Sequence, residues 1–309
     1  MIKNLLESGK ILMLLAVFIS FSLTGCNSGA KQKDNNSEAE EEFESSLDAN
    51  TQEKFQAAKR IFYSLPSPIE TARILHNAGA TYNEEFLNPI DNSNGYITNL
   101  SMALNLGIYT ADLSYASLFD QTQITLNYIE VAKKMADGLN ILDAINENTI
   151  QQLEDNINNR QKIIDIISET LLNSNSYLSE KGLESTATII LVGGWVEGLY
   201  IAINLVGEEP IEDNEIVQRI VDQKLSIDFM INLLEEATDD PDAQSVLKDI
   251  IELKAIFDKI VIKQGENTAV TDPETNVTTL KSNSSNNLTK KVYDALAIKV
   301  NEIRNSYIS

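Results

Sequence analysis

The sequence predicts an all-α protein, folded as a single irregular bundle of about eight or nine helices. From about residue 49 onward, apolar residues recur at spacings of three and four, which is the period of a helix face and not of a strand. One stretch, 183–206, is apolar nearly all round, as is typical of a helix enclosed by others. No self-similar period is present, so a helical-repeat array is not expected.

The first half of this helical domain, 49–309, divides at clear start and stop signals. The first helix is marked by apolar residues at helical spacing: Phe55, Ala58, Ile61 and Phe62. A second helix begins at Ser67 and Pro68, a favoured N-cap followed by a favoured first helical residue, and Gly79 is placed to end it. Residues 88–95 then predict a loop. Two more helices are expected over 100–119 and 121–139.

The second half continues the helical series with one interruption. A long amphipathic helix is expected over 146–177, with its polar face on the surface of the bundle. Further helices are expected over 183–206 at the centre, and over 211–236, 241–262 and 288–303. The polar stretch 264–287 holds Asp272-Pro273, which fits a type I turn, so 269–280 is a candidate for a small hairpin.

The first twenty-five residues carry the features of a signal peptide. Lys3 and Lys10 precede an apolar stretch over 11–21, which is shorter than the roughly 20 residues that a membrane span needs. The string Leu23-Thr24-Gly25-Cys26 then resembles the lipobox of bacterial lipoproteins, and Cys26 is the only cysteine. The resemblance implies cleavage before Cys26 and attachment of lipid, including palmitate, to its sulfur. The acylated cysteine would hold the protein to a bilayer without any further membrane helix.

Residues 26–48 predict a disordered, acidic tether between the lipid and the helical domain, because they contain few residues to bury. The stretch 31–34 is similar to surface-export signals of Bacteroidota lipoproteins. Asn27 stands where some inner-membrane lipoproteins have an aspartate, so the outer membrane of the cell envelope is the expected location. The formal net charge of −22 disfavours nucleic acid as a partner.

Four strings in the first half carry a family resemblance: YSLPSP at 63–68, AGATY at 78–82, LNLGIY at 104–109 and ADLSY at 111–115. They resemble an uncharacterised family of Bacteroidota envelope lipoproteins, most closely over about residues 60–140. The resemblance implies an envelope location and a helical fold. It implies no activity.

Histidine chemistry is limited by composition. His76 is the only histidine, which excludes sites that need two imidazoles, including most zinc centres and paired Glu-x-x-His di-iron bundles. Near a helix end, His76 is expected to stabilise the last carbonyls. A Ser-His-Asp arrangement is an alternative, but no serine lies in a nucleophile-elbow sequence. No metal or cofactor is therefore expected.

Two acids are unusual because each is the only charged residue of a long apolar helix. Asp112 is alone over 101–119 and has Tyr109 and Tyr115 near it at helical spacing. Glu197 is alone over 185–207, on a stripe with Gly193, Tyr200 and Asn204. Burying a carboxylate without compensation costs several kcal/mol, so each acid should be paired, protonated or in contact with water.

Two hypotheses follow for these acids. In the first, they line one polar pocket with ligand-binding candidates from both helices: Tyr109, Asp112, Tyr115, Glu197, Tyr200 and Asn204. In the second, each acid accepts hydrogen bonds from tyrosine, asparagine or an arginine such as Arg73 or Arg219, and fixes the register of its helix. Carboxylates on opposite sides of the fold would exclude the pocket.

Glycines inside the central helix also need a reason, since each costs about 1 kcal/mol relative to alanine. Gly193, Gly194 and Gly198 would let another helix approach closely. A membrane span over 186–206 is an alternative interpretation, but Glu197 near its midpoint favours a buried central helix.

The leading functional expectation is a non-enzymatic, membrane-anchored envelope lipoprotein that binds an unknown small ligand or a partner protein. The first alternative is a helical enzyme that uses Asp112 or Glu197 as general acid or base, which requires a carboxyl pKa raised towards neutrality. The second alternative is a purely structural scaffold, which predicts no convergent pocket.

Overall fold

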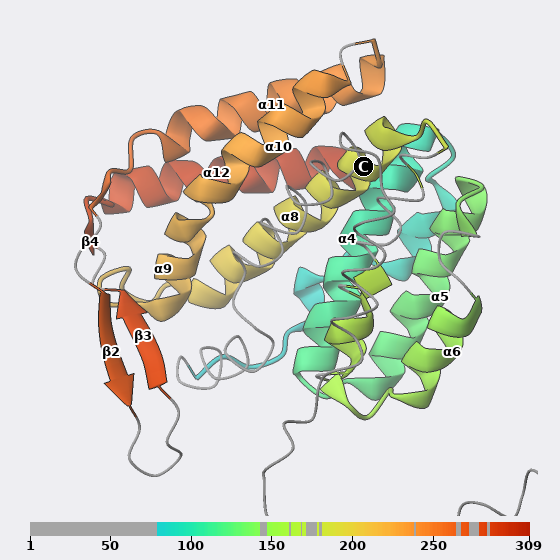
Figure 1. The fold of residues 1–309 in the computed structure, drawn as a ribbon, viewed down its shortest axis with the longest axis horizontal. Coiled ribbons are helices and arrows are strands. Elements are labelled where there is room, and N and C mark those ends of the chain that lie inside the picture. The colour runs from blue at the N-terminus through green and yellow to red at the C-terminus, as the bar shows by residue number, and fades with distance from the viewer. Residues whose placement is uncertain are drawn as a thin grey trace, which may run out of the picture. The chain divides into compact units, whose positions relative to one another are not determined.

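Helices make up nearly all of the described secondary structure, which confirms the all-α class (Figure 1). A computed structural model describes residues 79–142, 147–160, 162–167, 169–170, 178, 181–237, 239–263, 267–271, 278–282 and 285–309. The expected signal peptide, the tether and the first two helices lie outside the described residues. Gly79, at their edge, has a φ of +65°, the left-handed conformation expected at a helix stop.

The first described helices match their predictions closely. Two short 3₁₀ helices, η1 (Glu84–Phe86) and η2 (Ile90–Asn94), precede α4 (Asn99–Leu118) and α5 (Thr122–Gly138). The loop predicted over 88–95 therefore contains η2. Thr98 and Ser101 form a reciprocal capping box that fixes the start of α4.

Two of the predicted long helices are wrong because each is interrupted. The helix expected over 146–177 stops at the end of α6 (Glu147–Asp155), and helical backbone resumes at Arg160. The Asn159 side chain accepts the backbone N–H of Lys162, which caps the new start. The helix expected over 211–236 consists of α9 (Glu215–Asp222) and α10 (Lys224–Glu236), which meet at Gln223.

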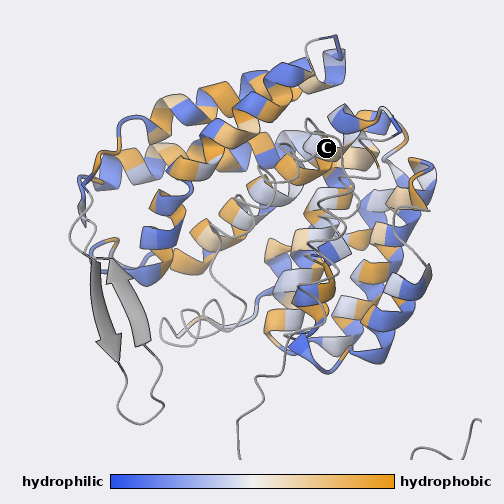
Figure 2. Cartoon of the chain, viewed as in Figure 1, coloured by the Kyte–Doolittle hydropathy of each residue, from blue (hydrophilic) through white to orange (hydrophobic). Residues whose placement is uncertain are grey.

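The central position of α8 (Glu184–Val206) is confirmed. It contacts α4, α9 and α10, and also α11 (Pro241–Phe257) and α12 (Lys290–Tyr307). In the described part of the chain it alone is long and apolar enough to cross a membrane. Figure 2 shows its apolar residues among those of the helices around it, which fits the core helix of a bundle.

Glycines bring α4 and α8 into backbone contact. A Cβ added to Gly107 would lie 2.0 Å from the carbonyl oxygen of Ile190, and one added to Gly193 would lie 2.2 Å from that of Leu104. No larger residue fits at either position, so the close helix approach expected from the sequence is present. Gly198 has no described atom within 4 Å of its would-be Cβ and takes no part in this contact.

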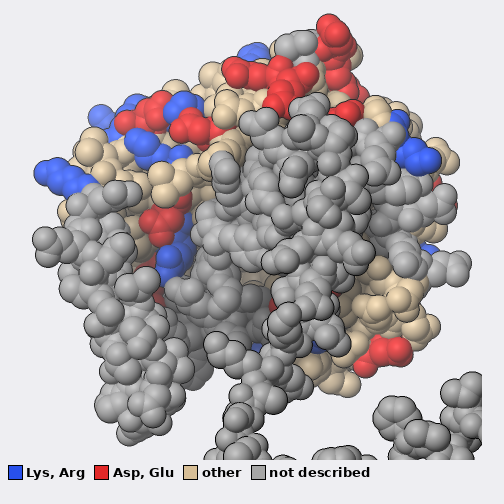
Figure 3. Space-filling view, viewed as in Figure 1, with Lys and Arg blue, Asp and Glu red and all other residues tan. Residues whose placement is uncertain are grey.

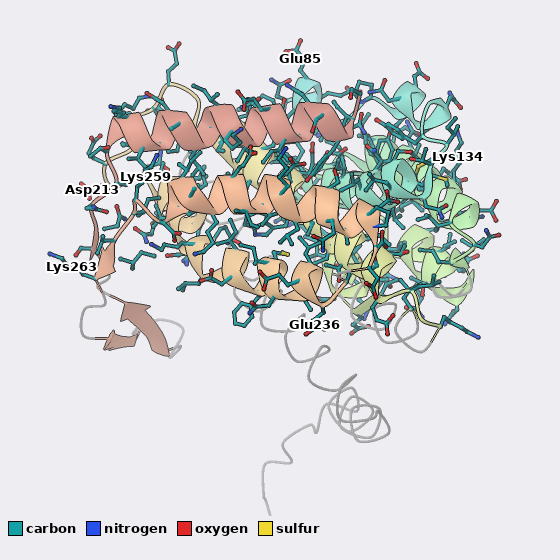
Figure 4. All side chains as sticks on the ribbon, turned by 90° about the horizontal axis from the view of Figure 1, so that it is seen from above. Glu85, Lys134, Asp213, Glu236, Lys259 and Lys263 are labelled. Carbon is teal, nitrogen blue, oxygen red and sulfur yellow. The ribbon has the colours of Figure 1, made fainter. Side chains whose placement is uncertain are left out.

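The small hairpin expected over 269–280 is confirmed and is slightly longer. Strand β2 (Asn267–Thr271) pairs antiparallel with β3 (Thr278–Ser282), with Ala269 opposite Leu280. A second short pair joins β1 (Ile262–Lys263) to β4 (Ser285–Asn286). These strands connect α11 to α12, and α11 contacts both α10 and α12, between which it is seen in Figure 4. The strands thus return the chain so that α12 can lie against both α11 and α8.

Candidate functional site

The two isolated acids meet at the contact between α4 and α8. Asp112 projects from α4 and Glu197 from α8, and each is 0% exposed. The Glu197 charge acts directly on Asp112 across this contact. The glycine contact lies about one turn from each acid on the same two helices and brings the backbones close together there.

Arg304 of α12 is the counter-ion of this acid pair. Its Nε donates to Glu197 Oε2 at 3.0 Å and its Nη2 donates to Glu197 Oε1 at 3.1 Å. Nη2 also donates to the carbonyl oxygen of Phe86 at 3.3 Å, and the guanidinium carbon lies 4.3 Å from the centre of the Tyr200 ring. Arg304 is 5% exposed, so this two-pronged ion pair is shielded from water.

Of the two arginines named as possible partners of the acids, Arg219 was wrong, because it forms an ion pair with Asp222 at 3.3 Å on α9. Arg73 lies outside the described residues. Arg304 was missed because the last helix was expected to end at residue 303, whereas α12 continues to Tyr307. A charged residue at helical spacing from the apolar Leu296 and Val300 was the signal that could have indicated it.

The two acids differ in their partners. Asp112 Oδ2 accepts the backbone N–H of Asn88 at 3.1 Å, whereas Oδ1 receives no conventional donor from the described residues. Burial raises the pKa of Asp112 well above its usual range, and the neighbouring Glu197 charge raises it further. Burial also raises the pKa of Glu197, but the charge and hydrogen bonds of Arg304 oppose that rise. The arrangement therefore favours a protonated Asp112 beside an ionised Glu197.

A network of buried amides and phenols surrounds the acid pair. The Nδ2 of Asn88 donates to Tyr96 Oη at 3.1 Å and to Asn105 Oδ1 at 2.9 Å. Asn105 in turn donates to the carbonyl oxygen of Tyr307 at 2.9 Å, and Tyr96 donates to that of Ile308 at 3.1 Å. These bonds fasten the C-terminal end of α12, and with it Arg304, to α4.

The other ligand-binding candidates separate into two groups. Tyr200 lies beside the acids, under the Arg304 guanidinium. Tyr109 donates to the carbonyl oxygen of Pro89 at 3.0 Å, and burial raises its pKa. Asn204 donates to the backbone carbonyl of Tyr200 at 2.8 Å. The structure thus brings Asp112, Glu197 and Tyr200 together, and the remaining candidates use polar atoms in separate internal bonds.

Tyr115, the last candidate, belongs to an aromatic cluster next to the acids. Its hydroxyl accepts the backbone N–H of Asn83 at 3.0 Å. Its ring stacks on Tyr82 at 5.4 Å between centroids and contacts Phe119 at 5.0 Å. Tyr115 is buried, so its role here is packing between η1 and α4.

No group of three or more histidine, cysteine, aspartate or glutamate side chains suited to a metal ion occurs among the described residues. His76 and Cys26 lie outside them. On the face seen in Figure 3, acidic side chains are interspersed with basic ones. Lys254, for example, pairs with Asp228 and with Asp258, both at 2.9 Å.

Comparison with family models, with curated proteins and with solved structures gives no match to this chain. The geometry of the acid cluster therefore has to be interpreted from its own residues.

Proposed function

We propose that the chain is a lipid-anchored protein of the bacterial cell envelope and a non-enzymatic scaffold, whose helical domain is held together by the Asp112, Glu197 and Arg304 cluster. The lipobox-like string ending at Cys26 supports the anchor, with the outer membrane as the expected site. Partner proteins would meet the outer surface of the bundle, since the cluster is buried inside it.

One observation carries the scaffold assignment. Asp112 and Glu197 are both 0% exposed, and Glu197 has both carboxyl oxygens bonded to Arg304. A substrate or small ligand needs a solvent-reachable cavity with polar groups left for it. Asp112 and Glu197 are buried together and Glu197 is paired with Arg304. Such a cluster is better suited to holding α4, α8 and α12 together than to binding a ligand.

The enzyme alternative is favoured by a single feature, the raised pKa of Asp112, which a general acid at neutral pH would need. A catalytic acid must also come within hydrogen-bonding reach of its substrate. Asp112 has no exposed surface, so such contact would require α4, α8 and α12 to separate. The scaffold assignment is therefore preferred.

The anchor is tested by metabolic labelling with radioactive palmitate in the unsubstituted protein and in Cys26→Ala. Labelling should disappear in Cys26→Ala and remain in the neighbouring control Ser28→Ala. Equal labelling of all three proteins would contradict the lipid anchor.

The scaffold assignment is tested by thermal unfolding in the presence of amino acids, sugars and short peptides. A ligand at one hundred times its Kd adds about 2.7 kcal/mol to the stability of a folded protein, which a melting experiment detects readily. No saturable stabilisation is expected. A saturable rise in the midpoint that is lost in Asp112→Asn would show that the cluster binds a ligand.

A further inference from the structure

We propose that Asp112 and Glu197 share a single proton, with Asp112 as donor and ionised Glu197 as acceptor, and that the junction of α4, α8 and α12 loses stability as pH rises because it must keep this proton. The shared proton would make the stability of this junction depend on pH, whether or not the chain is lipid-anchored or acts as a scaffold.

The buried geometry requires one of the two carboxyl groups to keep a proton. Both groups are fully buried on helices that contact each other, and the Glu197 charge acts on Asp112, so two ionised carboxylates would repel each other with no water to screen them. Glu197 has both oxygens occupied by the Arg304 guanidinium, so it fits the ionised member. Asp112 has one oxygen bonded to the Asn88 N–H and one without any described donor. A proton on that second oxygen gives Asp112 a hydrogen bond to donate to Glu197.

The charge balance leads to the same assignment. One carboxylate and one guanidinium cancel, whereas two carboxylates would leave a net negative charge in a site without water contact. Three phenols lie near enough to Asp112 to feel its charge: those of Tyr82, Tyr109 and Tyr128. Burial raises the pKa of each, so all three stay neutral. The ring of Tyr200, on α8, faces the guanidinium of Arg304. Glu84 acts only on the outer phenols, Tyr82 and Tyr128.

The consequence for stability follows from proton linkage. The unfolded chain releases the Asp112 proton at about pH 4, whereas the folded chain retains it to higher pH. Across that range the folded state binds one more proton than the unfolded state, so its stability decreases as pH rises. The contribution is fully present below about pH 4 and is lost as pH rises through the folded-state pKa.

Asparagine at position 112 imitates the protonated acid. Its carbonyl oxygen can accept the Asn88 N–H, and its amide can donate to Glu197 without any proton to lose. Asp112→Asn should therefore fold and remove the pH dependence. Between pH 5 and the pH at which Asp112 titrates, the ratio of the unfolding constants of the unsubstituted protein and Asp112→Asn should rise about tenfold per pH unit.

The experiment is urea unfolding from pH 5 to 9, followed by fluorescence of Trp195, the only tryptophan. Glu197→Gln should unfold more readily than Asp112→Asn at every pH, because it leaves Arg304 buried without its counter-ion. Asp91→Asn is the exposed control, and its ratio to the unsubstituted protein should stay level. The proposal would be overturned if the ratio of unfolding constants for Asp112→Asn did not change with pH and Asp112→Asn lost as much stability as Glu197→Gln.

A second measurement does not depend on any variant folding. Infrared spectroscopy of the unsubstituted protein with ¹³C-labelled aspartate should show a protonated carboxyl band that persists at neutral pH. Absence of that band at pH 7 would overturn the proposal, whatever the unfolding data show.

Discussion

Replacing Arg304 with methionine should destabilise the protein more than any surface substitution. Methionine keeps most of the aliphatic volume but removes both hydrogen bonds to Glu197 and the one to the Phe86 carbonyl. Glu197 is 0% exposed and Arg304 5%, so water cannot replace the lost partner. Removing one member of a buried ion pair costs about 3–5 kcal/mol, and two charged hydrogen bonds at about 1.5–3 kcal/mol each give a similar range of about 3–6 kcal/mol.

The assay is urea unfolding followed by far-ultraviolet circular dichroism, with Trp195 fluorescence as a local report from α8. Arg219→Met is the matched control, because its ion pair with Asp222 is on the surface and should contribute about 0–1 kcal/mol. Adding Glu197→Gln to Arg304→Met should recover part of the loss, since no charge is then left without a partner. Equal stability of Arg304→Met and Arg219→Met would refute the reasoning.

Two further predictions concern helix contacts and helix ends. Gly107→Ala places a Cβ 2.0 Å from the Ile190 carbonyl oxygen, so α4 and α8 must separate and thermal unfolding should show a loss of at least about 1–3 kcal/mol. Gly198→Ala, which meets no described atom within 4 Å, should instead stabilise α8 by about 0.5–1 kcal/mol, and a loss there would contradict the described contact. Thr98→Ala removes the side chain that accepts the Ser101 N–H and should cost about 1 kcal/mol in urea unfolding, and no change would show that the capping box is not stabilising.

The helical class, the central helix and the hairpin could be predicted because each follows from local pattern. From 185 to 206 the only charged residue is Glu197, so the helix there is expected to be enclosed by others. The breaks at Asn159 and Gln223 could not be predicted in the same way. Gln223 accepts a hydrogen bond from Trp195 Nε1 at 3.0 Å, a contact between residues distant in sequence. Periodicity carries no information about such a contact.

The acid cluster was predicted in part. An isolated acid in an apolar helix signals burial with a partner; Asp112 and Glu197 are both fully buried, and Glu197 is paired with an arginine. The identity of the arginine depended on how α12 returns to α8, which is a tertiary property. Tyr109 and Asn204 share helix faces with the acids but donate to backbone carbonyls, those of Pro89 and Tyr200. Spacing along one helix could not distinguish these outcomes.

The most direct test of a closed cluster is hydrogen exchange at the Nε of Arg304, followed by NMR after transfer into D₂O. This proton is bonded to Glu197 at 3.0 Å and is shielded from water, so it should exchange only when the protein opens. The Nε proton of Arg160, whose side chain is 51% exposed, should exchange at once and provides the reference. A persistent Arg304 signal is the predicted result. Loss of both signals at the same rate would show that water reaches the cluster, and would contradict the account of Asp112, Glu197 and Arg304 as a sealed junction.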